Sequence, residues 1–428
     1  MARRHETPPR PDSRTGDLAV MELSLINAQL NQGGMGDFGR FWGASGLMGA
    51  PRFQIVYRIT PDDSRPIEAH AKDICLEETV EIPGDCVPGP IWDAGIVGQV
   101  EAITPCAPPS HAFDVEISYR ADIVNDSIPN LLNVIFGNIS IRRGIKIVDI
   151  RLTGDQLRAF GGPRFGIAGL RQALGVYGRP LAATAIKPLG LSVPELARLA
   201  GGYALGGLDV VKDDHGLMDQ PFHPFKERVS RLQEAIRNAN AKTGRKTLYF
   251  PMIAGRFDQI EAQMAFAAAE GCAGALIAPL LIGPDTGFYL ARKYGLAVMT
   301  HPSFTGTHFH DPEHGMTPAM LLGRLFRIFG ADISVFPNAG GRFTFTPKEC
   351  RDLAIAMQEP LGDVRPGFPS PAGGMTIERI DSMVAAFGHD AVFLIGGALM
   401  RHSPEPEAGA RAFMAAIEKA VATGKATE

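Results

Sequence analysis

Residues 206–216 read GGLDVVKDDHG, a short apolar run that ends in four consecutive ionisable side chains. The apolar run predicts a buried strand, and ionisable groups beside it are unfavourable unless they act together. Asp214 and its neighbours offer the hard oxygen ligands that Mg²⁺ prefers. Lys212 cannot bind a cation as an ammonium, but it can once carbamylation with CO₂ has reversed its charge. The stretch therefore predicts a cation site at the carboxyl end of a strand; the simpler alternative is a charged strand end in solvent.

Composition places the chain among ordinary globular proteins. It has 428 residues, of which 45% are hydrophobic and 21% charged, enough for two domains with their own cores. The net charge of −4 argues against a nucleic-acid partner, and no apolar run reaches the ~18 residues of a membrane span. The five cysteines are scattered without zinc-ligand spacing, which favours a reduced, cytoplasmic location. Residues 1–16, rich in Arg and Pro without a following apolar region, are predicted to be a disordered tail.

The first half of the chain has a strand-rich pattern. Alternating apolar and polar residues predict strands, and longer amphipathic segments between them predict helices. The pattern favours an α+β domain of ferredoxin-like type over residues 17–160, with a Pro/Gly-rich join at 161–178. The predicted strands are 53–59, 113–119 and 145–152, and the predicted helices are 66–77 and 127–136.

The second half changes to short apolar segments that alternate with amphipathic helices. This alternation is typical of β-α units on a parallel sheet. The predicted strands are 181–186, 208–211, 247–253, 273–278, 296–300, 332–336, 365–368 and 391–395. The predicted helices are 193–204, 224–241, 258–270, 317–329, 347–358 and 377–387. Eight units over residues 161–428 predict an α/β fold, a (β/α)8 TIM barrel, whose active site lies at the carboxyl ends of the strands.

Polar residues and glycines follow several of these predicted strands. Lys187 could serve as a general base or electrophile, and His301 could orient a substrate or carry a proton. Arg342 could clamp a phosphate or carboxylate. Each also has a structural alternative: a surface lysine, a hydrogen-bonded core histidine and a solvated loop arginine.

Two glycine pairs follow the last two predicted strands, and a histidine cluster lies in a loop. Paired glycines let backbone N–H groups approach a phosphate, although they also serve ordinary turns. These pairs are Gly373-Gly374 and Gly396-Gly397. The cluster of His308, His310 and His314 lacks the closing ligand spacing of a zinc site.

These residues, taken together, resemble a known family. The motifs are Ile186-Lys187-Pro188, residues 206–214, Gln220-Pro221-Phe222 and His314-Gly315-Met316, in addition to the paired glycines. They resemble the large subunit of ribulose bisphosphate carboxylase (RuBisCO) from about residue 53 to the C-terminus, in the same two-domain order.

The resemblance implies a role for each matched residue. Lys212 matches the lysine that is carbamylated to hold Mg²⁺, and Asp214 matches a metal ligand. Lys187 matches the lysine that handles the enolisation proton, and His301 an active-site histidine. The paired glycines match phosphate-binding loops. Glu77 and Asn138 match N-domain residues that reach a partner's barrel, which implies a homodimer with shared active sites.

The chain also departs from the carboxylase pattern. The second lysine after Ile-Lys-Pro is missing, and His215 stands where the third metal ligand is Glu. Pro302 replaces an arginine, and Ile82-Pro83 replaces a Thr-Trp phosphate contact. Apart from Arg342, no residue corresponds to the mobile-loop lysine that addresses CO₂. The chain is therefore identified as a RuBisCO-like protein (form IV) rather than a carboxylase.

The resemblance implies a metal-stabilised enediolate formed from a phosphorylated substrate. From the sequence we favour a Mg²⁺-dependent lyase or hydrolase acting on a keto sugar acid of the 3-oxo-isoapionate 4-phosphate type. One alternative is a methionine-salvage enolase or isomerase of a diketo phosphate, although that branch carries a lysine where Asn138 stands. A second alternative is a non-catalytic binding protein that kept the fold.

Overall fold

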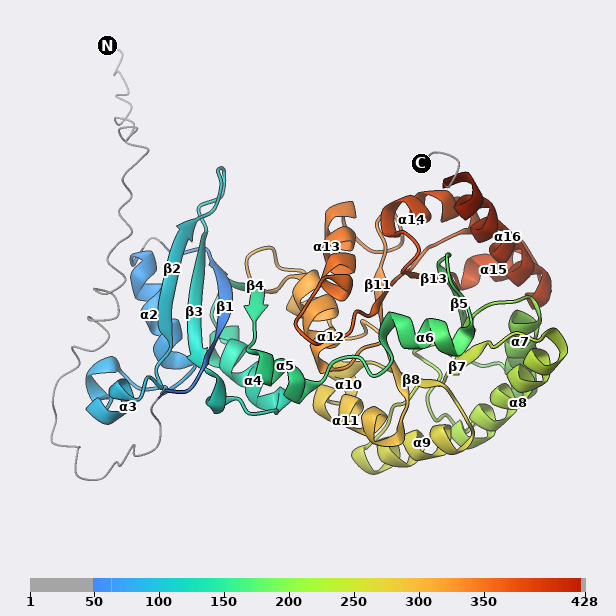
Figure 1. The fold of residues 1–428 in the computed structure, drawn as a ribbon, viewed down its shortest axis with the longest axis horizontal. Coiled ribbons are helices and arrows are strands. Elements are labelled where there is room, and N and C mark those ends of the chain that lie inside the picture. The colour runs from blue at the N-terminus through green and yellow to red at the C-terminus, as the bar shows by residue number, and fades with distance from the viewer. Residues whose placement is uncertain (1–48, 63, 425–428) are drawn as a thin grey trace, which may run out of the picture.

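A computed structural model describes residues 49–62 and 64–424 of the chain. The predicted tail at 1–16, and residues 17–48 of the predicted first domain, lie outside the described residues. The described chain forms an N-terminal α+β domain beside an α/β barrel, as the sequence predicted (Figure 1). The boundary at residue 160 stays a prediction.

The N-terminal domain is a sheet in the order β10-β4-β1-β3-β2. Along the chain its elements follow the β-α-β-β-α-β order of ferredoxin-like domains, with β1 antiparallel to both β3 and β4. Its strands are β1 (Arg52–Ile59), β2 (Gln99–Pro105), β3 (Phe113–Arg120), β4 (Ile145–Arg151) and β10 (Gly315–Met316). Its helices are α2 (Ile67–Glu77), α3 (Gly89–Asp93), α4 (Ile128–Phe136) and α5 (Gly154–Phe160).

Two features of this sheet were not predicted. Strand β2 was missed because a register shift between Val100 and Ala102 interrupts the alternation that marks a strand. Strand β10 comes from the second half of the chain and pairs in parallel with β4, so the barrel contributes one strand to the N-terminal sheet.

The barrel is built from eight parallel strands, each close to a predicted segment. They are β5 (Leu181–Ile186), β6 (Val210–Asp213), β7 (Leu248–Phe250), β8 (Gly274–Ile277), β9 (Ala297–Thr300), β11 (Ile333–Pro337), β12 (Phe368–Ala372) and β13 (Val392–Leu394). They pair as β13-β5-β6-β7 and β8-β9-β11-β12. A bridge between Met252 and Leu276 joins the two sheets on one side, and β12 and β13 lie together on the other.

Helices surround the strands in Figure 1. They are α6 (Gly166–Leu174), α7 (Val193–Leu205), α8 (Phe225–Thr243), α9 (Phe257–Ala269), α10 (Pro279–Ile282), α11 (Pro284–Tyr294), α12 (Phe326–Phe329), α13 (Pro347–Gln358), α14 (Ile380–Phe387), α15 (Gly397–His402) and α16 (Pro406–Gly424). Helix α6 lies within the segment predicted as a join. The helix predicted at 317–329 is a π-helical turn, Ala319–Leu325, that continues into α12. None of the described helices is long and apolar enough to cross a membrane.

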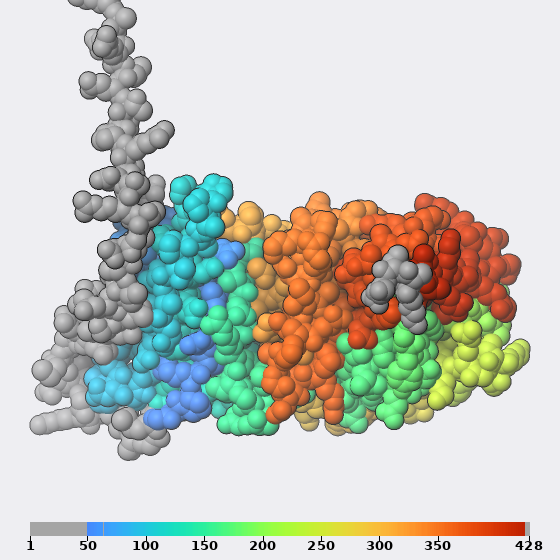
Figure 2. Space-filling view, turned by 45° about the horizontal axis from the view of Figure 1, so that its top comes forward, coloured from blue at the N-terminus to red at the C-terminus, as the bar shows by residue number. Residues whose placement is uncertain are grey.

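The two parts lie side by side along the long axis of the molecule. In the space-filling view, the orange segment that includes α13 lies between the blue and cyan N-terminal domain and the red C-terminal helices (Figure 2).

Helix α13 begins with a reciprocal cap, because the Glu349 N–H donates to Thr346 Oγ1 at 3.2 Å and the Thr346 N–H donates to Glu349 Oε2 at 2.8 Å.

Candidate functional site

The residues predicted at the strand ends of the barrel lie around one cavity. It has a volume of about 690 Å³ at the carboxyl ends of the strands. Its lining includes the ten predicted barrel residues: Lys187, Lys212, Asp214, His215, His301, Arg342, Gly373, Gly374, Gly396 and Gly397. Residues more than 200 positions apart in sequence thus share a single concave site.

The alternation of β6 separates the roles of its charged residues. Successive side chains of a strand point to opposite faces, so Lys212 points into the barrel and Asp213 points out toward the helices. Lys212 is only 1% exposed, and it lies beside Ala185 of β5 at the floor of the cavity. Asp214 then returns to the cavity side just beyond the strand.

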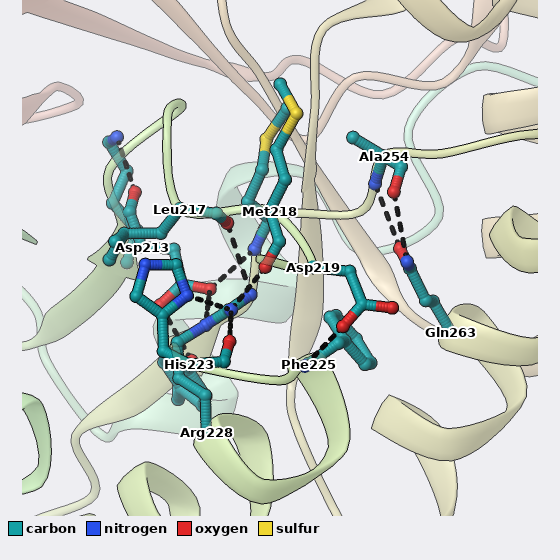
Figure 3. Close-up of polar contacts among 12 residues, drawn as sticks. Asp213, Leu217, Met218, Asp219, His223, Phe225, Arg228, Ala254 and Gln263 are labelled. Atoms are coloured by element: carbon teal, nitrogen blue, oxygen red, sulfur yellow. Dashed lines mark hydrogen bonds and ion pairs between the residues drawn. The ribbon is translucent and has the colours of Figure 1, made fainter. Parts of the chain in front are cut away.

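Asp213 forms a buried ion pair with Arg228 of α8 (Figure 3). Arg228 Nε lies 3.2 Å from Asp213 Oδ2, and neither side chain is exposed. Asp213 also accepts the Tyr249 hydroxyl at 2.8 Å and the Met252 N–H at 3.0 Å. The Asp213 carboxylate is therefore occupied by these buried partners, and it does not line the cavity.

Arg228 also holds the loop that follows β6. It donates to the carbonyls of Leu217 and His223, both at 3.1 Å, and to that of Met218. Figure 3 shows these carbonyls converging on the guanidinium. Because Asp214 and His215 begin this loop, the buried arginine fixes the segment that carries them.

Asp214 lies beside two other ionisable side chains, Lys187 and His215. Lys187 Nζ lies 3.0 Å from Asp214 Oδ1, and His215 Nδ1 lies 3.6 Å from the same oxygen. Burial alone would raise the pKa of Asp214, but His215, Lys187 and Lys212 lower it well below its usual value, so it is a carboxylate. Burial lowers the pKa of Lys212 to about 8, although Asp214 opposes the shift. A neutral amine on Lys212 is therefore accessible near neutral pH.

His301 is held as a neutral imidazole against His215. The two rings stack with centroids 4.2 Å apart and an interplanar angle of 13°. Burial, followed by the charge of Lys212, lowers the pKa of His301 well below its usual value. The Ser303 N–H donates to His301 Nδ1 at 3.2 Å, so that nitrogen is an acceptor and the ring proton lies on Nε2.

The glycine loops pack closely around the other side of the cavity. A Cβ on Gly341 would lie 2.0 Å from the carbonyl oxygen of Gly373, and the Arg342 N–H donates to that oxygen at 3.2 Å. A Cβ on Gly396 would lie 3.4 Å from Lys187 Cε. Because Gly341 and Gly396 have no side chain, Arg342 can lie beside Gly373 and Lys187 beside Gly396.

The structure adds lining residues that the sequence did not reveal. Phe309, Phe343 and Phe345 form an apolar wall, with the rings of Phe309 and Phe345 5.5 Å apart at 79°. Arg401 of α15 and Ser303 also line the cavity. The phenylalanines gave no signal in the sequence, because they come from two loops without periodicity.

The histidine loop serves packing and lining. Among residues 49–62 and 64–424, no three His, Cys, Asp or Glu side chains come together as a group that could hold a metal ion. His310 lines the cavity, whereas His314 stacks on Phe136 with centroids 5.5 Å apart. Lys146 of β4 holds this loop by donating to the carbonyls of Phe309, Asp311 and His314.

Glu77 and Asn138 do not line the cavity of their own chain. Asn138 Nδ2 donates to Glu77 Oε1 at 3.1 Å and to Glu81 Oε1 at 2.8 Å. Arg142 holds the other oxygen of Glu77 at 3.1 Å. The two residues thus form one polar cluster on the N-terminal domain; their reach into a partner's cavity stays a prediction.

The donor groups of the cavity fit a divalent cation only with a modified lysine. Asp214 offers a carboxylate oxygen and His215 an imidazole nitrogen. The protonated side chain of Lys212 has no lone pair and carries a positive charge, so it cannot bind a cation beside them. A carbamate on Lys212 would supply the missing oxygen. The set then fits a divalent ion, with a nitrogen that Mg²⁺ seldom takes.

Comparisons with known proteins agree with this geometry. Residues 166–341 match the family model of the ribulose bisphosphate carboxylase large chain, catalytic domain. The chain is 38% identical to 5-methylthioribulose-1-phosphate isomerase of Rhodospirillum rubrum over 375 residues, which cover 87% of this chain and 98% of the relative. It is 30% identical to 2,3-diketo-5-methylthiopentyl-1-phosphate enolase of Geobacillus thermodenitrificans, over 77% of this chain and 82% of the relative. The crystal structure of a Rubisco-like protein from Rhodopseudomonas palustris superposes with a TM-score of 0.78 at 37% identity, covering 86% and 98% of the two chains.

Proposed function

Because the chain belongs to the RuBisCO-like proteins of the ribulose bisphosphate carboxylase large-chain superfamily, we propose that it is an enolase or isomerase of a methylthio-substituted keto-pentose phosphate. The proposal is the methionine-salvage alternative, not the sugar-acid reaction that the sequence favoured. Relatives named for methylthio phosphates support this change.

One observation carries the proposal. Lys187 lies 3.0 Å from Asp214 and against the backbone of Gly396, so a proton carrier, a cation ligand and a phosphate-type loop share one cavity. Moving a proton next to a carbonyl in a phosphorylated substrate needs these three elements within one substrate length.

Each group of the cavity then has a task. A divalent cation held by Lys212, Asp214 and His215 would polarise the substrate carbonyl and make the neighbouring C–H acidic. Lys187 carries the proton, and His301 offers its Nε2–H to a substrate oxygen. Arg342 and the glycines at 373–374 and 396–397 hold the phosphate.

Carbamylation of Lys212 completes the ligand set. The ammonium first loses one proton to solvent; the neutral amine then attacks CO₂, an N–C bond forms, and a second proton leaves, so a cationic side chain becomes anionic. A pKa of about 8 keeps much more of this amine neutral at pH 7–8 than an ordinary lysine.

The apolar wall favours a methylthio group over a sugar acid. Phe309, Phe343 and Phe345 line the same cavity as the charged residues. Sulfur makes favourable contacts with aromatic rings, of about 0.3–1.5 kcal/mol each, whereas hydroxyl or carboxylate groups would lose hydration there.

The sugar-acid reaction remains a second candidate for one reason. Arg401 lines the cavity in addition to Arg342, and two guanidinium groups could hold a phosphate and a carboxylate separately. The third alternative, a non-catalytic binding protein, predicts that ligand binding survives Lys212→Ala.

We also propose a homodimer in which Glu77 and Asn138 reach the cavity of the partner subunit. Their exposed cluster, away from the cavity of their own chain, supports this assembly. The cysteines, all unpaired and all within the described residues, support a cytoplasmic location.

The test is turnover of three candidate substrates by the purified protein after incubation with bicarbonate and a divalent cation. Proton and phosphorus NMR would follow 5-methylthioribulose 1-phosphate, the diketo phosphate and 3-oxo-isoapionate 4-phosphate in parallel. We expect conversion of a methylthio compound, lost after chelation and in Lys187→Ala. Conversion of the sugar acid alone would overturn the substrate assignment, and conversion of none would favour a binding protein.

A further inference from the structure

We infer that the cation site selects a first-row transition-metal ion, such as Mn²⁺, Co²⁺ or Zn²⁺, over Mg²⁺. The reason is His215, which places an imidazole where the resemblance expects a carboxylate. This inference rests on the proposed function, because it concerns the same cation.

The imidazole of His215 is placed to share an ion with Asp214. Its Nδ1 lies 3.6 Å from Asp214 Oδ1. Two donors that bind one ion at about 2.1 Å lie about 3.0–3.5 Å apart, so little movement separates this pair from joint coordination. His215 is 47% exposed at the side chain, and the ring faces the cavity.

Stacking on His301 restricts the ring of His215. The rings are nearly parallel, at 13° and 4.2 Å. His301 itself is anchored by Ser303, whose N–H and hydroxyl both lie at Nδ1, at 3.2 and 2.8 Å. Because the His301 proton then lies on Nε2, the imidazole lone pair available for an ion belongs to His215.

Asp214 is the one Asp or Glu among the described residues that line the cavity. Within the described chain, His, Cys, Asp and Glu side chains form no group of three that could hold an ion. The site therefore offers one carboxylate, one imidazole and, after carbamylation, one carbamate. Its charge is two negatives rather than the three of an all-oxygen set.

Ligand chemistry then decides the ion. Mg²⁺ prefers oxygen ligands and is held mainly by their negative charge. A nitrogen in place of one carboxylate therefore lowers Mg²⁺ affinity for two reasons: an oxygen ligand is lost, and so is one negative charge. Imidazole suits the later divalent ions, whose affinity rises along the series from Mn²⁺ to Cu²⁺. We therefore expect the exchange of Glu for His to move selectivity away from Mg²⁺.

The experiment measures ion binding without substrate. Full-length protein, equilibrated with bicarbonate, is titrated calorimetrically with Mg²⁺, Mn²⁺ and Co²⁺, as wild type and as His215→Glu. The matched control is His111→Glu, which changes an exposed histidine of the N-terminal domain. Bound Mn²⁺ is also examined by electron spin-echo modulation, which detects a directly bonded ¹⁴N.

We expect His215→Glu to lower the ratio of Co²⁺ to Mg²⁺ affinity by at least about tenfold, because even outer-shell changes alter metal affinity about 10- to 100-fold. The control should leave the ratio unchanged, and the ¹⁴N signal of wild type should disappear in His215→Glu. Should that variant fail to fold, ¹⁵N-histidine labelling of the wild type shows whether the nitrogen bound to Mn²⁺ belongs to a histidine; a signal that labelling does not change would overturn the inference.

Two outcomes separate this inference from the proposed function. An unchanged ratio, or no nitrogen signal from bound Mn²⁺, overturns the inference, while turnover with Mg²⁺ leaves the proposed function intact. Absence of any divalent-ion binding in the presence of CO₂ overturns both.

Discussion

Replacing Arg228 by Met is expected to destabilise the barrel and loosen the cation site together. The guanidinium is fully buried and holds Asp213 at 3.2 Å and three loop carbonyls. Removing one partner of a buried pair leaves the other charge uncompensated, which costs about 3–5 kcal/mol. Methionine fills most of the volume, so the loss is mainly electrostatic.

The assay is denaturant unfolding of the barrel together with Co²⁺ affinity in the presence of bicarbonate. Arg228→Met should lose about 3–5 kcal/mol of unfolding free energy. The matched control is Arg231→Met on the same helix, whose side chain is 64% exposed and meets Glu234 at 3.4 Å. That change should cost less than about 0.5 kcal/mol, as exposed pairs do.

A double-mutant cycle with Asp213→Asn tests the reasoning directly. If the unpaired carboxylate causes the loss, the double variant should be more stable than the sum of the single losses predicts, by about 1–3 kcal/mol. Strict additivity would refute the ion-pair explanation. Normal Co²⁺ affinity in a folded Arg228→Met protein would refute its link to the loop that carries Asp214.

Three further predictions concern other parts of the protein. Gly341→Ala should raise the KM for the phosphorylated substrate without unfolding the protein, because its Cβ would lie 2.0 Å from the Gly373 oxygen; Gly89→Ala, with open space, is the control. The rate of CO₂ activation should rise as pH increases through about 8, because only the neutral Lys212 amine reacts and burial lowers its pKa; a midpoint near 10.5 would contradict this. Glu78→Gln should lower the unfolding free energy by about 1–3 kcal/mol, since one of two backbone N–H groups that Glu78 accepts at 2.7 and 2.9 Å would face an NH₂ group; an unchanged melting curve would contradict it.

Local signals predicted much of the barrel. The strand at 181–186 and the helix at 347–358 were predicted to the residue, because a buried apolar run and a capped amphipathic segment mark them clearly. The convergence of Lys187, Lys212 and His301 followed from the fold, since strand ends meet at one face of a barrel.

Strand β12 shows where local signals mislead. The strand predicted at 365–368 instead begins at Phe368 and continues through Pro369 and Pro371, although proline is unusual inside a strand. The N–H of Phe368 donates to Asp332 next to β11, so the alternating prolines face the β13 side. Strand β12 pairs with β11 on its other side. The prolines have no N–H to donate, but this does not interrupt the hydrogen bonds between β12 and β11.

Contacts across the sequence could not be predicted from local pattern. Arg228 looked like any arginine on a surface helix, yet it is fully buried against Asp213. The stack of His215 on His301 joins two loops far apart in the chain. Such pairs depend on how the strand ends face one another, which only the folded barrel defines.

The most direct test of the account is hydrogen exchange at the carbon next to the substrate carbonyl. Protein activated with bicarbonate and a divalent cation is incubated with a methylthio-ketose phosphate in D₂O, and the C–H signal is followed by NMR. Deuterium incorporation should need both activators and should disappear in Lys187→Met. Exchange that persists without a metal, or in that variant, would contradict the proposed function.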